Sequence, residues 1–197
     1  MTDGQAQQYD GEIVQEDYIK YRMISDKIIV AATGDVEIID KFYEESFAMY
    51  EFGLNIKQMA LKLQELMIEF VEYNEEDPLL GYCINMLVGG VAEDGELEYY
   101  ILSNSYQSME ELVIYDFRDE DAGDFAASYL VSPYAPSSKE LSDTLYTAVK
   151  KNGDTFLVNC GENIISAQKE LHKYVASVDR TVNDNIFSKV INKRAYL

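Results

Sequence analysis

The segment that most constrains the fold is residues 20–35, which read KYRMISDKIIVAATGD. The half-polar residues 18–24 predict a partly exposed strand, and a Ser-Asp turn separates it from the apolar run 28–32. This uninterrupted run predicts a strand that is buried on both faces. Gly34 then breaks the strand, and Asp35 is a good N-cap for a helix, whose first N–H groups can face a ligand. We expect the rest of the chain to pack around this unit.

Two amphipathic helices are predicted to follow. Apolar residues recur with helical spacing in residues 36–52, and Gly53 is suited to end that helix. Asn55 and Gln58 have the spacing of a capping box at the start of a second helix. The methionines of this second helix lie on its apolar stripe, which favours a role in the core.

A buried hairpin is predicted after these helices. Residues 82–92 form an apolar run, and an Asp-Gly pair at Gly95 predicts a tight turn into a partner strand at residues 97–103. Gly89 and Gly90 interrupt the first strand, which indicates either a bulge or a close approach of another backbone.

The second half of the chain mixes short strands with two longer helices. Strands are predicted at residues 112–117, 125–131, 155–159 and 185–191, and helices at 139–151 and 162–178. Because like elements follow one another in runs, we predict an α+β fold in which helices are grouped against antiparallel sheets. A length of 197 residues suits one domain, residues 1–197.

The charge excludes one class of function and leaves another open. The chain carries 36 acidic and 16 basic residues, for a net charge of −20, and should repel nucleic acid phosphates. An acidic protein that binds a basic partner remains an alternative.

No apolar run approaches the length of a membrane span, and the N-terminus is polar. Cys83 and Cys160 are far apart in sequence, so we expect two reduced thiols in a cytoplasmic protein.

Two blocks of the sequence resemble proteasome β-subunits and their simpler bacterial relative, the peptidase ring that partners an unfoldase. Both are N-terminal nucleophile (Ntn) hydrolases. The first block runs from Lys20 through the helix that follows Gly34, and the second is the hairpin that begins NMLVGGV at residues 85–91. The resemblance implies an αββα sandwich that assembles into rings.

The resemblance also implies roles for individual residues. In the family an N-terminal threonine attacks a peptide carbonyl, a lysine lowers the pKa of this nucleophile, and an aspartate orients the lysine. By position, Lys20 matches the lysine and Thr2 matches a substrate-lining threonine. Gly34 matches the glycine whose N–H group serves as an oxyanion donor.

The family's nucleophile and aspartate lie upstream of the position that Met1 matches. We therefore expect an αββα fold that lacks the first β-hairpin, and a subunit that is inactive as the sequence stands. The alternative is a threonine-type peptidase or amidase, acting on peptides, whose true start lies upstream. An uncovered sheet edge tends to pair with another chain, which predicts a homo-oligomer.

The remaining candidates have simpler explanations beside the functional one. Lys20 also fits an ordinary surface lysine, and Thr2 as a nucleophile lacks a rigid strand behind it. Cys160 sits where a helix start can lower a thiol pKa, but His172 is more than two turns away along the same helix.

The family's late serine-bearing turn is matched equally by residues 132–135 and 159–161. The acidic residues 116–124 miss the spacing of a calcium loop, so we expect no metal and no cofactor.

Overall fold

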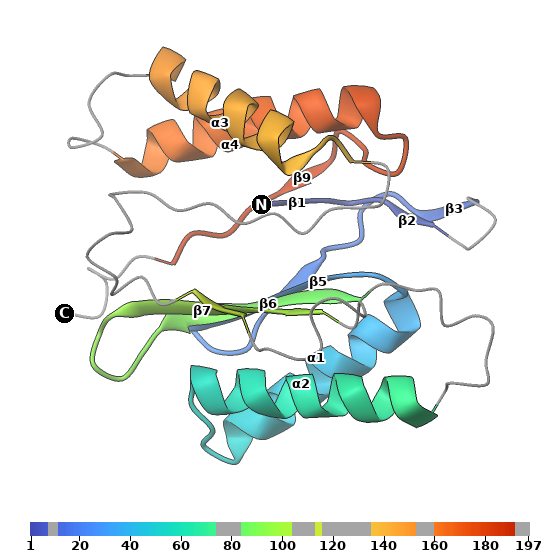
Figure 1. Ribbon diagram of the computed structural model, residues 1–197, viewed down its shortest axis with the longest axis vertical. Coiled ribbons are helices and arrows are strands. Elements are labelled where there is room, and N and C mark those ends of the chain that lie inside the picture. Colours follow the sequence, from blue (N-terminus) through green and yellow to red (C-terminus); the bar gives the residue numbers. More distant parts are fainter. Residues whose placement is uncertain (8–11, 74–83, 104–112, 116–134, 153–159, 192–197) are drawn as a thin grey trace. The chain divides into compact units, whose positions relative to one another are not determined.

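The computed structural model describes residues 1–7, 12–73, 84–103, 113–115, 135–152 and 160–191 (Figure 1). The chain divides into two compact units. Unit 1 comprises Met1–Lys20 and Ala122–Lys189, and unit 2 comprises Tyr21–Asp121 and Val190–Leu197.

In the described part of unit 2, five strands form one antiparallel sheet in the order β4-β5-β6-β7-β8. Their bounds are β4 Tyr21–Met23, β5 Ile28–Thr33, β6 Asn85–Val91, β7 Leu97–Ser103 and β8 Val113–Tyr115. The predicted hairpins are confirmed, although β4 is shorter than the expected residues 18–24. Burial along β5 alternates between buried and half-buried side chains, so the prediction of full burial on both faces is wrong. Ile29, Ala31 and Thr33 lie on the half-buried face.

Two helices of unit 2 begin where the sequence predicts, because their caps are local. They are α1, Val36–Glu51, and α2, Ile56–Tyr73. The Asp35 carboxylate accepts from the Ile38 N–H at 3.1 Å. Asn55 and Gln58 bond reciprocally, with N-to-O distances of 2.9 and 3.1 Å, which satisfies two N–H groups that the helix itself leaves unpaired. The predicted capping box is therefore confirmed.

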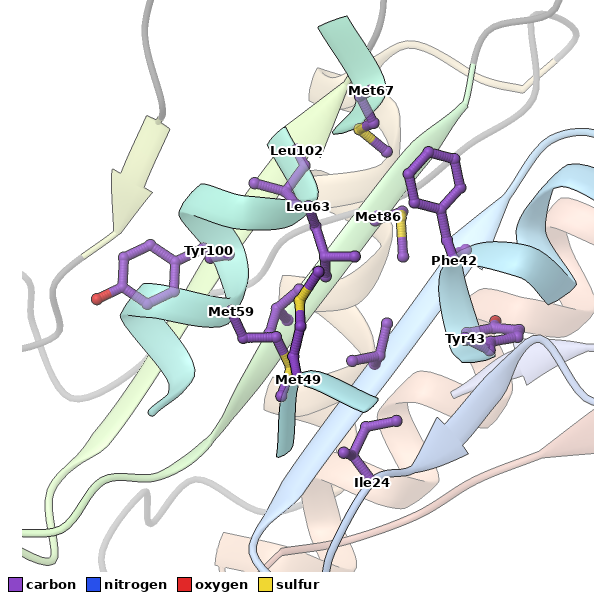
Figure 2. Close-up of a cluster of buried hydrophobic side chains, with 14 of the residues drawn as sticks. Ile24, Phe42, Tyr43, Met49, Met59, Leu63, Met67, Met86, Tyr100 and Leu102 are labelled. Carbon is purple, nitrogen blue, oxygen red and sulfur yellow. The ribbon is translucent and has the colours of Figure 1, made fainter. Parts of the chain in front are cut away.

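The core of unit 2 lies between these helices and one face of the sheet (Figures 1 and 2). Met59, Leu63 and Met67 of α2 are almost fully buried, as are Met86 of β6 and Leu102 of β7. Figure 2 shows these side chains converging from the helices and the strands. The methionines are therefore packing residues, as their place on the apolar stripe indicates.

The hairpin of β6 and β7 pairs without interruption from Asn85 with Ser103 to Val91 with Leu97. Its turn is the predicted one, with Gly95 at a φ of 83°. Of the two readings of Gly89 and Gly90, the bulge is wrong and the close approach is confirmed. A Cβ at Gly90 would overlap the Lys27 carbonyl oxygen, and one at Gly89 would lie 2.6 Å from Tyr99 Cβ.

Unit 1 combines short strand pairs with two helices. Their bounds are β1 Thr2–Asp3, β2 Ala6–Gln7, β3 Ile13–Gln15, α3 Ser138–Asn152, α4 Cys160–Val178 and β9 Ile186–Phe187. β1 pairs with β9 and β2 with β3, both antiparallel. Leu141, Leu145 and Ala167 belong to a buried cluster through which α3 and α4 pack together. The helices match their predicted positions closely, whereas β9 is much shorter than the expected residues 185–191.

The helices and antiparallel sheets of the described residues confirm the α+β class. The strands predicted at residues 125–131 and 155–159 lie outside the described residues, and single-domain organisation stays a prediction. No helix in the described ranges combines the length and the apolar character that a membrane span requires.

Replacing Gly90 by alanine should destabilise the protein by about 1–3 kcal/mol, because the added methyl group overlaps a backbone carbonyl that is itself bonded to Val91 N. Urea unfolding followed by circular dichroism measures this change. Gly53→Ala is the matched control, since Gly53 has a φ of 81° but open space around it. It should cost about 1 kcal/mol from backbone strain alone. A Gly90→Ala protein as stable as the wild type would contradict the close approach.

The N-terminus of α3 provides a prediction about pH. Glu140 accepts from Ser137 Oγ at 2.7 Å and from Ser137 N at 2.9 Å, and these bonds lower the pKa of its carboxyl group. A lowered folded pKa contributes stability above the ordinary pKa of glutamate, and this is lost as the pH falls through the folded value. Ser137→Ala should raise the Glu140 pKa toward its ordinary value, measured by NMR titration of the side-chain carboxyl carbon. An unmoved titration in that variant would exclude the cap as the cause.

Candidate functional site

A largely buried ion pair joins Lys20 to Asp3 in unit 1. Lys20 Nζ lies 2.7 Å from Asp3 Oδ2 and 2.9 Å from Asp3 Oδ1. Only 17% of the lysine side chain and 12% of the aspartate side chain are exposed. The lysine that the family resemblance singles out is therefore held by a carboxylate on both of its oxygens, and the reading of Lys20 as an ordinary surface lysine is wrong.

Sequence reasoning missed Asp3. We expected the aspartate that orients the lysine to lie upstream of Met1, and that expectation is wrong, because Asp3 itself holds Lys20. The signal was present in the Asp-Gly-Gln sequence at residues 3–5, which local rules interpret only as a turn. It is a turn as well, since Asp3 Oδ1 accepts from Gln5 N at 2.9 Å.

The pair forms because two chain segments cross at Gly4. Tyr18 N donates to Gly4 O at 2.8 Å, which ties the segment that carries Lys20 to the segment that carries Asp3. A Cβ at Gly4 would lie 2.5 Å from Glu16 O and 2.7 Å from Phe187 Cε2. Real Cβ atoms do not approach other atoms this closely, so the crossing requires glycine.

The electrostatic consequence is a fixed positive charge away from bulk water. In such surroundings a charge interacts more strongly with its neighbours than at the surface. Removing either partner would leave the other as an uncompensated, mostly buried charge. Lysine supplies a compact point charge with three donors, and two of its bonds here go to one carboxylate.

Thr2 lies beside Asp3 in β1, and successive side chains of a strand are expected to point to opposite faces. In the described part of the chain, Thr2 Oγ1 is buried without a hydrogen-bond partner. Its predicted role in lining a substrate site stays a prediction.

Gly34 belongs to unit 2, where it links β5 to α1 with a φ of 138°. This backbone conformation favours glycine, as the strand-to-helix turn predicts. Its N–H group as an oxyanion donor stays a prediction.

The cysteine candidate gains no support. Cys160 is the first residue of α4, and its side chain lies outside what the structure describes. His172 Nε2 donates to Asn183 O at 2.8 Å, so this nitrogen is already bonded within unit 1. Residues 116–124 and 132–134 lie outside the described ranges. Among the residues that are described, no three histidine, cysteine or acidic side chains gather as a metal site would require.

No protein-family model and no curated protein matches the chain. Among solved structures, the chain is similar to the eukaryotic HslV of Trypanosoma brucei, a proteasome-like Ntn hydrolase. The TM-score is 0.52 and the sequence identity 14%, and the match covers 93% of this chain and 87% of that chain. An identity this low bears on architecture alone. The chain therefore has a fold like that of the proteasome-like Ntn hydrolases.

Proposed function

We propose that the chain is a subunit of a proteasome-like assembly, and that Lys20 and Asp3 are the charged part of a site for peptide hydrolysis. The observation that carries this proposal is the largely buried, doubly bonded ion pair within a chain of this fold. The likeness to HslV supports the fold, and the pair supports the chemistry.

A structural role alone explains the pair poorly. Buried ion pairs contribute little net stability, and apolar residues of similar volume often replace them at no cost. Functional sites, in contrast, need charged groups that supporting contacts hold in a defined geometry. A lysine ammonium fixed in this way would stabilise the negative oxygen or sulfur of a nucleophile placed next to it.

The nucleophile is the part that these residues do not supply. In the part of the chain that is described, both hydrogen bonds of Lys20 Nζ go to Asp3, and none goes to a serine, threonine or cysteine side chain. We infer that the 197 residues by themselves do not cleave peptides. The second candidate is a threonine-type peptidase or amidase in which a preceding strand brings the nucleophile to Lys20, and the intact pair favours it.

We also propose a homo-oligomer. Within the described residues, β1 pairs only with β9, over two residues, and an edge strand readily accepts a further strand. Light scattering that shows a monomer would contradict this proposal. The third reading, an acidic protein for a basic partner, rests on the net charge of −20 alone.

The hydrolysis proposal predicts two results with short fluorogenic peptides. The 197-residue chain should release no fluorophore above the buffer rate. The protein isolated from its own cells, if it carries a preceding strand that begins with threonine, serine or cysteine, should cleave them. In that protein Lys20→Met should lower kcat by about 100-fold or more, the scale for losing a positioned charge.

The matched control is Lys62→Met, because Lys62 pairs with Glu65 at a similar distance, 2.8 Å, but on the surface. It should leave kcat unchanged. A longer protein that is inactive, or one whose activity survives Lys20→Met, would count against a hydrolytic site.

The burial of the pair predicts a separate effect on stability. Asp3→Asn leaves the Lys20 ammonium without its counter-charge and should lower the free energy of unfolding by about 2–4 kcal/mol, slightly below the range for fully buried pairs. Glu65→Gln breaks an exposed pair and should cost about 0.5 kcal/mol or less. Urea unfolding at neutral pH measures both. Equal losses in the two variants would show that Asp3 and Lys20 are solvated.

A further inference from the structure

We propose that Asn183 is a positioning residue for the Lys20–Asp3 pair, because its side-chain amide bridges the two segments that carry the partners. Asn183 lies in the loop between α4 and β9. Its meaning for catalysis rests on the function proposed above, whereas its contacts lie wholly within unit 1.

The two ends of the amide bond to different segments. Asn183 Oδ1 accepts from Gly4 N at 3.1 Å, directly after Asp3. Asn183 Nδ2 donates to Glu16 O at 2.9 Å, on the segment that leads to Lys20. Tyr18 N also donates to Gly4 O. Two links therefore join the segments at the crossing, and one of them depends on Asn183.

The loop holds Asn183 itself in place. Its carbonyl oxygen accepts from His172 Nε2 at 2.8 Å, which fixes the backbone to α4. Asn183 Oδ1 also accepts from Asn185 N at 3.1 Å, which fixes the orientation of the amide. The contacts with His172 and Asn185 N therefore orient the amide independently of the two segments that it bridges. A further bond, from Gln5 Nε2 to Arg180 O at 3.2 Å, joins the same loop to the segment that carries Asp3.

Only an amide satisfies both contacts. The Gly4 N–H group needs an acceptor and the Glu16 carbonyl needs a donor, and asparagine has one of each. Aspartate would keep the acceptor and lose the donor, and alanine would lose both. Without the bridge the two segments can shift relative to each other, and shifts of about 1 Å are enough to impair a catalytic arrangement.

The test reads the Lys20 ammonium group directly. In protein labelled with ¹⁵N-lysine, the Lys20 Nζ signal is assigned by its loss in Lys20→Met, and its proton exchange with water is measured. Asn183→Ala should speed this exchange by about 10-fold, which corresponds to about 1.4 kcal/mol, and move the signal toward that of Asp3→Asn. A merely structural role would lower stability and leave the ammonium of the folded protein unchanged.

Asn185→Ala is the matched control. Asn185 Nδ2 donates to the same Glu16 O at 2.7 Å but does not bond to Gly4, so its loss removes an equivalent bond without opening the bridge. It should leave the exchange within about 2-fold of the wild type, a small free-energy change. Unchanged exchange in folded Asn183→Ala, or an equal effect in Asn185→Ala, would overturn the inference.

If Asn183→Ala does not fold, Asn183→Asp replaces it. This variant keeps the acceptor for Gly4 but loses the donor to Glu16 O, so the bridge is open and exchange at Lys20 should again be faster than in the wild type. Exchange as slow as in the wild type would overturn the inference. The readout needs no hydrolysis. If the proposed function is wrong, the longer protein will be inactive, but Asn183→Ala will still speed exchange at Lys20. If this inference is wrong, the longer protein can be active, but Asn183→Ala will leave that exchange unchanged.

Discussion

The close crossing of two segments at Gly4 is the constraint on which the candidate site depends. Asp3 precedes the crossing point and Lys20 follows it on the other segment, so their side chains meet only if the backbones approach this closely. Any larger residue would collide with Glu16 O and with the Phe187 ring. The ion pair is thus a consequence of backbone geometry. Gly4, which has no side chain, lets the segments approach closely enough for the two charged side chains to meet.

The sequence predicted unit 2 well because its signals are local. The Asp35 cap, the Asn55 and Gln58 capping box and the turn at Gly95 each act over a few residues, and each is found as expected. Strand ends were less predictable, because pairing with a neighbour sets them. The burial of β5 was overestimated because apolar character shows only that a side chain can be buried. Whether another element covers it depends on long-range packing.

The site was predicted only in part because its contacts are long-range. Lys20 came from a family resemblance, and its own sequence surroundings are those of a surface residue. Asp3 is 17 residues away, and Asn183 is 179 residues from Gly4, so no periodicity or spacing connects them. An asparagine in a polar loop has many ordinary roles, and only the folded chain distinguishes this one from the rest.

The number of polar contacts around Asp3 bears on whether the pair serves structure or chemistry. Its carboxylate receives Lys20 and the Gln5 N–H, and the next peptide group is held by Asn183. Stability alone would be achieved more simply by apolar packing, since each buried polar group must be satisfied to avoid a cost of about 1–3 kcal/mol. Orientation, in contrast, requires such a supporting set, because a charge acts on a neighbouring group only from a defined position. The supporting contacts in unit 1 therefore favour the proposal that this arrangement places one ammonium group.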